Sequence, residues 1–563
     1  MEPATGWGVP PFAVGAGNRF KISAADIARR HTPFSCPMGL ALGARFRAGS
    51  LRPDPSAGRP RFDKAATVNF ATERAARAVT EDADPNAFLD GERDLTHSQR
   101  RFVRHALDVL PDLLPEASRA GRVEYRTRQS IVGRVAMGAL HGTVTVFAVH
   151  LAGDGPEGPV HEAVRLRLKG LRAVTDADAD WTAVAAVALA TDDEVDERAR
   201  IRVSAFSVLD GELRCLFDGS RADAISALRD RGNVLLDALG GTVFRPGSAC
   251  VGCAFLAVCP AVESRPGLLG ASRGVARRRV SASDLAAYAR CPTAFRARAD
   301  YLPARYADVA DLEPGVAQRR GLAAHSWLAW AHAREPAVPC DPQDLPPPGS
   351  PAGDAAAAAA SLDPEDYALA HPYLVHHPAH CLAGHPALGA FAPERPVVTH
   401  DPDADAVVIS TPDLAAASRD GGEPVWRETK TAGSIPPDLA TAMLRYPDLA
   451  LNVVLLADRA DRTGVRGDAE LEVLTPAGAR VFAVATDQTD IVQQARDLVT
   501  GIAGPFVTDT DFDRKPGPAC ATCPAHGWCD PPEDQVRFGG TVPVSPGAAC
   551  DSDGADADDD PPF

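Results

Sequence analysis

Residues 520–529 read CATCPAHGWC, and residues 250–259 read CVGCAFLAVC. Both stretches hold three cysteines at the spacing Cys-x2-Cys-x5-Cys. A single cysteine precedes each trio by more than 200 residues, Cys291 in one case and Cys36 in the other. Four thiolates arranged in this way can hold a metal centre that connects the beginning of a domain to its end. The repeated pattern therefore predicts two copies of one domain, one after the other.

The sequences around the two single cysteines are also alike. Residues 21–30 read KISAADIARR, residues 279–288 read RVSASDLAAY, and a proline follows each single cysteine. A serine followed by a spaced aspartate and apolar residues is typical of a capped helix start, and the proline ends or redirects that helix. We therefore place one copy at 20–262 and the second at 280–533.

Four further segments complete the predicted organisation. Residues 1–19 are an N-terminal extension, and residues 263–279, with a proline and several glycines, are expected to form a linker. Residues 343–363 contain runs of proline and of alanine and are predicted to be a mobile low-complexity insertion. Residues 534–563 form an acidic tail, which we expect to be disordered.

The chain has 563 residues, of which 45% are apolar and 24% charged, so we expect a globular protein of two or three domains. Its net charge of −17 does not exclude a nucleic-acid partner, because arginines cluster at 273–279 and 296–320 and predict a local basic groove. No basic segment followed by an apolar one begins the chain, and we predict no membrane span. We expect a cytoplasmic protein, in which patterned cysteines favour metal ions over disulfides.

Two short segments of the second copy combine acidic residues with strand-like sequence. The apolar run 406–409 is followed by Thr-Pro-Asp413-Leu, and residues 426–430 read WRETK. Alternate side chains of a strand share a face, so Glu428 and Lys430 point the same way. If the two segments pair as a hairpin, Asp413 joins that face.

Two carboxylates on one face can bind a hard divalent cation, Mg²⁺ or Mn²⁺, through their oxygens. The neighbouring Lys430 could position or activate a water molecule and offset the charge of a phosphate, which describes a site for metal-assisted hydrolysis. His325, on a predicted helix upstream, could be a further metal ligand. Taken alone, the same residues also fit a surface hairpin with an ion pair.

The motifs of the second copy follow one another in a particular order. They are Cys291-Pro292, His325, Asp413, Glu428-x-Lys430 and the closing cysteine trio. This order resembles the RecB-type PD-(D/E)xK nucleases that carry an iron–sulfur cluster, a group that includes the AddB nuclease domain and the CRISPR-associated exonucleases. The resemblance covers most of residues 280–533. It implies an α/β fold with two tandem restriction-endonuclease-like domains, each a mixed central sheet flanked by helices and closed by four cysteines.

The resemblance also implies roles for the individual residues. Asp413 and Glu428 would bind the metal ion, with His325 and the Thr429 carbonyl assisting. Lys430 would be the catalytic lysine. A [4Fe-4S] cluster would be held by Cys291, Cys520, Cys523 and Cys529.

Two features leave alternatives open. Where the family usually carries a helix with Gln-x3-Tyr, this chain has Asp448 and Asn452, which puts the handling of a DNA strand in doubt. Four cysteines alone also fit zinc, so zinc remains the alternative to iron and sulfur in both sets.

The first copy has the cysteines without the acidic residues. The positions matched to the two carboxylates and the histidine carry Arg167, Ala136 and Asn69, and only Lys169 keeps the residue type. A divalent-metal site of this kind requires carboxylates, so we expect a non-catalytic partner domain. Its own cluster would be structural and held by Cys36, Cys250, Cys253 and Cys259.

A group of histidines surrounds Cys381. They are His371, His376, His377, His380 and His385. Because prolines interrupt any regular spacing, we interpret them as incidental histidines of a loop near the active site, with a zinc site as the alternative. Cys340 and Cys381 lie outside the repeated pattern and are interpreted as ordinary cysteines.

We therefore predict a divalent-metal-dependent DNA nuclease that acts on single-stranded or end-exposed DNA, in DNA repair or in defence. The alternative is a non-catalytic iron–sulfur DNA-binding or scaffold protein derived from such nucleases. A P-loop requires Gly-Lys, and this dipeptide does not occur in the sequence. A separate helicase or ATPase would have to supply any ATP-driven step.

Overall fold

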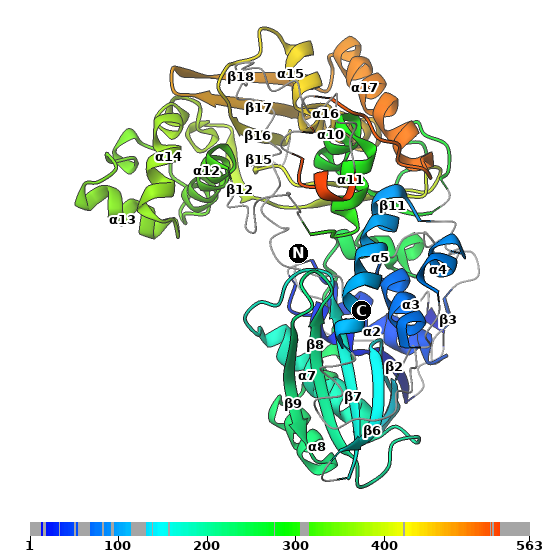
Figure 1. Ribbon diagram of the computed structural model, residues 1–563. Helices are drawn as coiled ribbons and strands as arrows, with labels where there is room; N and C mark the ends of the chain where they lie inside the picture. Colours follow the sequence, from blue (N-terminus) through cyan, green and yellow to red (C-terminus); the bar gives the residue numbers. More distant parts are fainter. Residues whose placement is uncertain are drawn as a thin grey trace.

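The computed structural model describes residues 13–14, 18–32, 34–49, 52–53, 68–80, 84–91, 95–113, 131–137, 139–155, 158–274, 276–303, 315–419, 423–517, 520 and 523–529. The acidic tail predicted at 534–563 and most of the N-terminal extension lie outside the described residues. Figure 1 shows two α/β lobes, one around the strands of each predicted copy.

The second half is built around a mixed five-stranded sheet. Its strands, in spatial order, are β12 (Leu388–Pro393), β15 (Leu414–Ser418), β16 (Val425–Thr431), β17 (Asp468–Thr475) and β18 (Gly478–Ala485). β16 and β17 are parallel, and the other neighbours are antiparallel. A parallel pair requires a crossover connection, which α15 (Leu439–Arg445) and α16 (Pro447–Thr463) supply. The predicted α/β fold with mixed sheets is therefore confirmed.

The core of this half forms around α16. Every residue of α16 from Leu449 to Ala457 is buried. α17 (Thr489–Thr508) packs Val492, Val499 and Ala503 into the same core. α16 packs against β17, and α17 packs on α16 and α10 (Ala282–Arg290). Figure 1 shows α17 beside α16 at the outer side of the lobe.

The first half repeats this topology. Its four-stranded sheet has the spatial order β6 (Val149–Gly155), β7 (Gly158–Arg167), β8 (Arg200–Ser207) and β9 (Leu213–Gly219). Its central pair, β7 and β8, is parallel and both outer pairs are antiparallel, as in the second half. α7 (Asp176–Ala190), which is almost entirely buried, is the crossover helix.

Each half also has a smaller sheet of matching topology. In the first half β5 (Leu140–Val146) lies between β2 (Arg19–Ser23), which is parallel to it, and β4 (Ile131–Met137), which is antiparallel. In the second half β14 (Ala406–Ser410) lies in the same way between β11 (Arg278–Val280) and β13 (Val397–Asp401).

The predicted helix starts before the two single cysteines are confirmed. Ser23 caps α1 (Ala24–Arg29) and Ser281 caps α10 (Ala282–Arg290), and in both cases the aspartate three residues later completes a capping box. A new helix begins at the proline after each cysteine, α2 (Pro37–Arg47) and α11 (Pro292–Ala299). Proline suits this first helical position because its missing N–H would have no helical partner there.

The segment expected to be a linker, residues 263–279, contributes strands to the smaller sheet of the second half. Its first residues form β10 (Glu263–Ser264), which pairs with β13, and its last residues belong to β11, which pairs with β14. The sheet order is therefore β10-β13-β14-β11. Gly267 and Gly270, both with positive φ, turn the chain between the two strands. Both edges of the β13–β14 hairpin offer unpaired backbone groups, which the connecting segment satisfies.

A helical insertion occupies residues 316–388. It contains α12 (Val316–His332), α13 (Pro351–Ala359) and α14 (Pro364–Leu374), with short 3-10 turns η5 (Pro342–Asp344), η6 (His377–His380) and η7 (Leu382–Gly384). The alanine run that we expected to be mobile forms α13, because alanine is the best helix former and Ser350 caps the helix. Figure 1 shows the three helices at the β12 side of the lobe.

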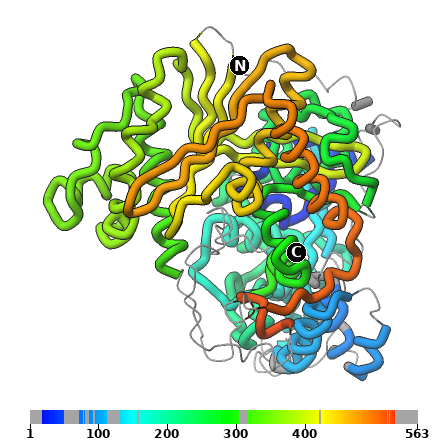
Figure 2. Tube along the Cα trace, turned by 90° about the horizontal axis from the view of Figure 1, so that it is seen from above, coloured from blue at the N-terminus to red at the C-terminus, as the bar shows by residue number. Residues whose placement is uncertain are grey.

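The two halves meet at the C-terminal cysteine trio. Trp528 in α18 (His526–Cys529) is 1% exposed and lies 5.1 Å from Phe102 of α5 (His97–Val109), between ring centroids. Trp528 Nε1 donates to the Pro303 carbonyl at 2.7 Å, and buried Gln99 Nε2 donates to Asp300 Oδ2 at 2.7 Å. Figure 2 shows the C-terminal segment beside this helical region of the first half.

The remaining described elements all belong to the first half. They are β1 (Ala13–Val14), β3 (Arg52–Pro53), α3 (Val68–Thr80), α4 (Pro85–Gly91), η2 (Leu110–Asp112), α8 (Arg221–Asp230), α9 (Val234–Leu239), η3 (Ser248–Gly252) and η4 (Leu256–Val258). In the part of the chain that the structure describes, no single helix is long and apolar enough to cross a membrane. Only α15 and α16 together pass by length and composition, and the chain bends by 102° between them.

Candidate active site

The predicted acidic residues come together at the edge between two sheets. Asp413 lies just after β14, which belongs to the smaller sheet, and just before β15, which pairs with β16. The expected pairing of the run 406–409 with residues 426–430 is wrong, because this run forms β14 and pairs with β13. The strand that pairs with β16 is β15, directly after Asp413, with Leu414 opposite Arg427. The backbone N–H of Thr429 donates to Asp413 Oδ2 at 2.6 Å. This bond fixes the carboxylate beside β16.

Glu428 and Lys430 form an ion pair on β16. Lys430 Nζ lies 2.9 Å from Glu428 Oε1, and the two side chains are 4% and 5% exposed. The two residues share one face of the strand, as predicted, because they are two positions apart. A buried lysine held by one carboxylate is therefore directed into the site.

Two more ligand candidates complete the site. His325 of α12 places Nδ1 2.8 Å from Asp413 Oδ1. Glu394, directly after β12, was not predicted. Its carboxylate, the His325 ring and the Asp413 carboxylate place ligand atoms within 4.8 Å of one another. Glu394 has φ +49, which is uncommon for a non-glycine residue, and its backbone N–H donates to the Asp413 carbonyl at 3.3 Å. No periodic pattern in the sequence before β13 marks Glu394 as a site residue.

A further contribution comes from α16. Asp448 Oδ1 lies 3.8 Å from Lys430 Nζ, so the helix after Glu-x-Lys does face the site, with a carboxylate where the nucleases that the sequence resembles usually have glutamine. Asn452, one turn later, is buried and its Oδ1 accepts a hydrogen bond from Ser410 Oγ. Asn452 therefore connects α16 to the smaller sheet.

The acidic groups of the site repel one another. Burial, and then the Asp413 and Asp448 carboxylates, raise the pKa of Glu428 well above its usual value. Burial and Asp413 also raise the pKa of Glu394. Burial acts in the same direction on Asp413, but His325, Lys430 and the Thr429 N–H outweigh it and lower its pKa. Four carboxylates thus face one lysine and one histidine, an arrangement that favours a bound cation.

Both predicted sets of four cysteines are gathered in space. Burial raises the pKa of Cys250 to about 11, and the neighbouring Cys36 and Cys259 thiols add to the shift. Burial likewise raises the pKa of Cys529 to about 11, again with contributions from the other three thiols of its set. The thiols of each set are thus close enough to affect one another's ionisation.

Backbone donors point at several of these sulfur atoms. Gly39 N lies 3.3 Å from Cys36 Sγ, Gly247 N lies 3.4 Å from Cys250 Sγ, and Gly517 N lies 3.4 Å from Cys520 Sγ. N–H groups directed at sulfur stabilise a thiolate and tune a metal centre bound to it.

The strand register suggests two further matches between the halves, beside the match made on sequence. Val149 of β6 pairs with Val164 of β7, as Leu414 of β15 pairs with Arg427 of β16. If the sheets are aligned at these pairs, Arg165 takes the place of Glu428 and Arg167 that of Lys430, two residues away from the match made on sequence. If the sheets are aligned instead at the first pairs of the parallel strands, Ala163 takes the place of Glu428 and Arg165 that of Lys430. In both alignments an arginine replaces the lysine, and no carboxylate takes the place of Glu428.

Arginines thus occupy the place of the acidic site in the first half. Arg165 Nη1 and Arg167 Nη1 lie 2.9 and 3.0 Å from Asp178 Oδ1 of α7. All three residues are buried. A carboxylate already paired with two guanidinium groups does not suit a divalent cation.

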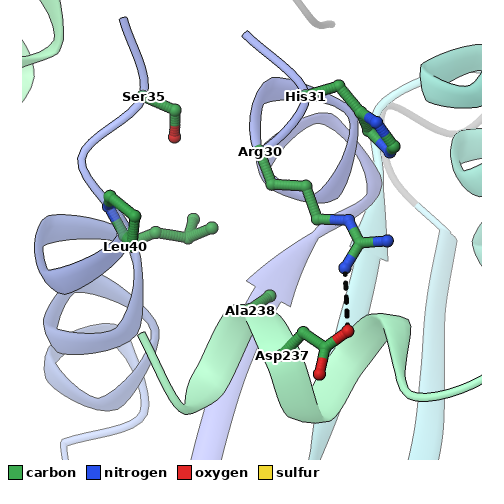
Figure 3. Close-up of a pocket in the computed structure, with 7 residues that line it drawn as sticks. Arg30, His31, Ser35, Leu40, Asp237 and Ala238 are labelled. Atoms are coloured by element: carbon green, nitrogen blue, oxygen red, sulfur yellow. Dashed lines mark hydrogen bonds and ion pairs between the residues drawn. The ribbon is translucent and has the colours of Figure 1, made fainter. Parts of the chain in front are cut away.

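A pocket of 290 Å³ lies elsewhere in the first half, beside the segment that leads to Cys36 (Figure 3). Arg30 reaches across it to Asp237, 3.4 Å away, and also to buried Asp180, 2.9 Å away. His31 Nε2 lies 2.7 Å from the same Asp180 carboxylate. Each charged group of this pocket therefore has an internal partner, and the pocket is separate from the acidic site of the second half.

Comparison with known proteins concerns the second half alone. No curated protein matches the chain. Residues 279–530, which run from β11 to the end of the C-terminal cysteine trio, match the family model of the PD-(D/E)XK nuclease superfamily.

Proposed function

We propose that the second half hydrolyses phosphodiester bonds of DNA with Mg²⁺ or Mn²⁺, on single strands or free ends. The superfamily match of residues 279–530 suggests nuclease activity. The observation that carries the proposal is the group of His325, Glu394 and Asp413, with ligand atoms within 4.8 Å, beside the buried Glu428–Lys430 pair.

The donor set fits a hard divalent cation. Carboxylate oxygens and one imidazole are suitable ligands for Mg²⁺ and Mn²⁺. Asp413, Glu394, Glu428 and His325 are the residues that would hold the ion. The raised pKa of Glu428, caused by burial and by its acidic neighbours, supports a site that gains stability when a cation is bound.

When bound, the cation polarises the scissile phosphate and supplies hydroxide at neutral pH. Lys430, held by Glu428 at 2.9 Å, orients the attacking water and offsets the charge of the phosphate. His325 and the Thr429 N–H hold the Asp413 carboxylate from two sides. The chain therefore positions the reacting groups before the substrate binds.

The first half is proposed to be a non-catalytic partner. Arg165 and Arg167 share Asp178 in the part of the first half that matches the acidic site, and this arrangement does not suit metal-dependent cleavage. The contact of Trp528 with Phe102 supports such a structural role.

The two sets of four cysteines are proposed to hold [4Fe-4S] clusters. The mutual effect of the thiols on their pKa values and the N–H groups directed at Cys36, Cys250 and Cys520 support a bound centre in each set. An absorbance spectrum and iron analysis of anaerobically purified protein test this. A colourless, iron-free protein that contains zinc in both sets would favour the zinc alternative.

A cleavage assay tests the nuclease proposal. Labelled single- and double-stranded DNA is incubated with protein and Mn²⁺ or Mg²⁺, and wild type is compared with Glu428→Gln. Asp461→Asn is the matched control, because Asp461 lies on α16 with its side chain 74% exposed. We expect metal-dependent cleavage by wild type and control, and none by Glu428→Gln. Wild-type cleavage by Glu428→Gln refutes the site. An inactive wild type with loaded clusters favours the DNA-binding scaffold.

A further inference from the structure

A second group of metal-ligand side chains lies inside the helical insertion. His332 ends α12, Cys340 follows in the next loop, and His377 and Cys381 flank η6. Their ligand atoms all lie within 4.8 Å of one another. We propose that these four residues bind a structural zinc ion, separate from both cysteine sets and from the acidic site.

The distances agree with tetrahedral zinc. His377 Nε2 lies 3.2 Å from His332 Nε2, and Cys381 Sγ lies 3.6 Å from His332 Nε2. Zinc bonds of about 2.1 Å to nitrogen and 2.3 Å to sulfur place two nitrogens about 3.4 Å apart, and nitrogen and sulfur about 3.6 Å apart, in a tetrahedron. Two thiolates also balance the charge of Zn²⁺, which suits a site where His332, Cys340 and His377 are buried.

A buried carboxylate orients one of the ligands. His377 Nδ1 lies 3.0 and 2.9 Å from the two oxygens of Glu472, and both side chains are 0% exposed. If Nδ1 carries the proton and donates it to Glu472, the Nε2 lone pair faces His332 and the sulfur atoms. A histidine held by a carboxylate in this way is the usual partner arrangement of a zinc ligand.

The insertion has a reason to need such an ion. Its own core is small and is formed mainly by alanines around Trp327 and Tyr367. A core of this size gains little from burial, and small units commonly rely on a metal for stability. Zinc at this place would join α12 to the segment after α14. Through Glu472 it would also fix both to β17 of the central sheet.

The ion would also position the proposed nuclease site, and this part rests on the proposed function. His325 and His332 lie on α12 seven residues apart, about two turns, and therefore on the same side of the helix. Glu472 accepts a bond from Thr429 Oγ1 at 3.2 Å, beside Glu428 on β16. His325 is thus a site residue whose placement depends on the zinc-bound end of its helix.

Metal analysis of the full-length protein tests the site. Zinc and iron are counted in anaerobically purified wild type, in Cys381→Ser and in the control Cys215→Ser, whose cysteine is exposed and belongs to neither set. We expect Cys381→Ser to lose about one zinc per chain, the number held by four ligands, with iron unchanged. Equal zinc in all three proteins overturns the proposal, and so does a Cys340–Cys381 disulfide in zinc-free protein.

A gentler variant covers the case in which Cys381→Ser does not fold. Glu472→Gln keeps the four ligands and should weaken zinc roughly 10–100-fold in competition with a chelating dye. Unchanged affinity refutes the role of Glu472. Zinc removal should also weaken Mn²⁺ binding at the His325 site. If the protein contains zinc but does not bind Mn²⁺, the proposed nuclease site is refuted and the proposed zinc site is not.

Discussion

Replacing Lys430 by methionine should destabilise the metal-free protein. Methionine keeps the length of the side chain and removes the ammonium group that lies 2.9 Å from Glu428. Glu428 then remains buried with Asp413 and Asp448 as neighbours. Removing one partner of a buried ion pair costs about 3–5 kcal/mol, because the other charge is left uncompensated.

This loss of unfolding free energy can be measured as a decrease in melting temperature. For a domain of about 150–250 residues, 1 kcal/mol shifts Tm by roughly 2–4 °C, so calorimetry in EDTA should show a decrease of roughly 6–20 °C. The pKa of Glu428 is raised in the folded protein, so the folded state holds a proton more tightly than the unfolded state. Stability is then lost as pH rises through the folded pKa, and the decrease should be larger at higher pH.

Two further measurements test whether the missing positive charge causes the lower melting temperature. Added Mn²⁺ should recover more stability in Lys430→Met than in wild type, because the cation replaces the missing positive charge. The double variant Glu428→Gln/Lys430→Met removes both charges and should melt close to wild type in EDTA. A single variant that melts like wild type in EDTA at every pH refutes the reasoning, because Glu428 would then not depend on Lys430.

Three other expectations concern separate parts of the molecule. Glu394→Gln should weaken Mn²⁺ binding on the order of 10-fold or more, measured by titration calorimetry, and unchanged affinity removes Glu394 from the ligand set. Asp405→Asn should cost about 3–5 kcal/mol at neutral pH, since Asp405 is buried with Arg277 at 2.9 Å. Burial alone would raise the pKa of Asp405, but the hydrogen bonds and charges of His400 and Arg277 outweigh burial, and the pKa is lowered. The stability that Asp405 contributes is therefore lost as pH falls, and urea unfolding at acid pH should show a smaller difference between the variant and wild type. Trp528→Ala should cost about 3–5 kcal/mol in the same assay, and a cost near zero means that the contact with Phe102 does not join the halves.

Regular features of the chain were predictable from sequence, and irregular ones were not. The capped helices at Ser23 and Ser281 and the strand that carries Glu428 follow local rules of spacing and capping, which one sequence displays. Glu394 enters the site from a loop with positive φ, and Asp448 enters because α16 folds back over the sheet. Glu394 has no local pattern, because tertiary packing alone brings it there. Asp448 stands at a position that the family resemblance singles out, but only the packing of α16 shows that its carboxylate faces Lys430.

The histidine-rich segment around Cys381 is a second case in which a site depends on contacts between residues distant in sequence. The irregular spacing around Cys381 favours incidental histidines and leaves zinc as the alternative, because spacing reflects only neighbours in sequence. The ligands proposed from the structure include His332 and Cys340, from another helix and loop. A four-ligand site assembled from two distant pairs is recognised only when the fold brings the pairs together.

The strands β10 and β11 have a consequence for how this chain can be divided. They belong to the stretch that separates the two halves in sequence, yet they hydrogen-bond to both sides of the β13–β14 hairpin. A fragment that begins at residue 280 would keep the acidic site and expose two bare strand edges, and exposed edges recruit other chains. The end of one repeat in sequence is therefore not the end of its hydrogen-bonded unit, so the second half is not a portable module.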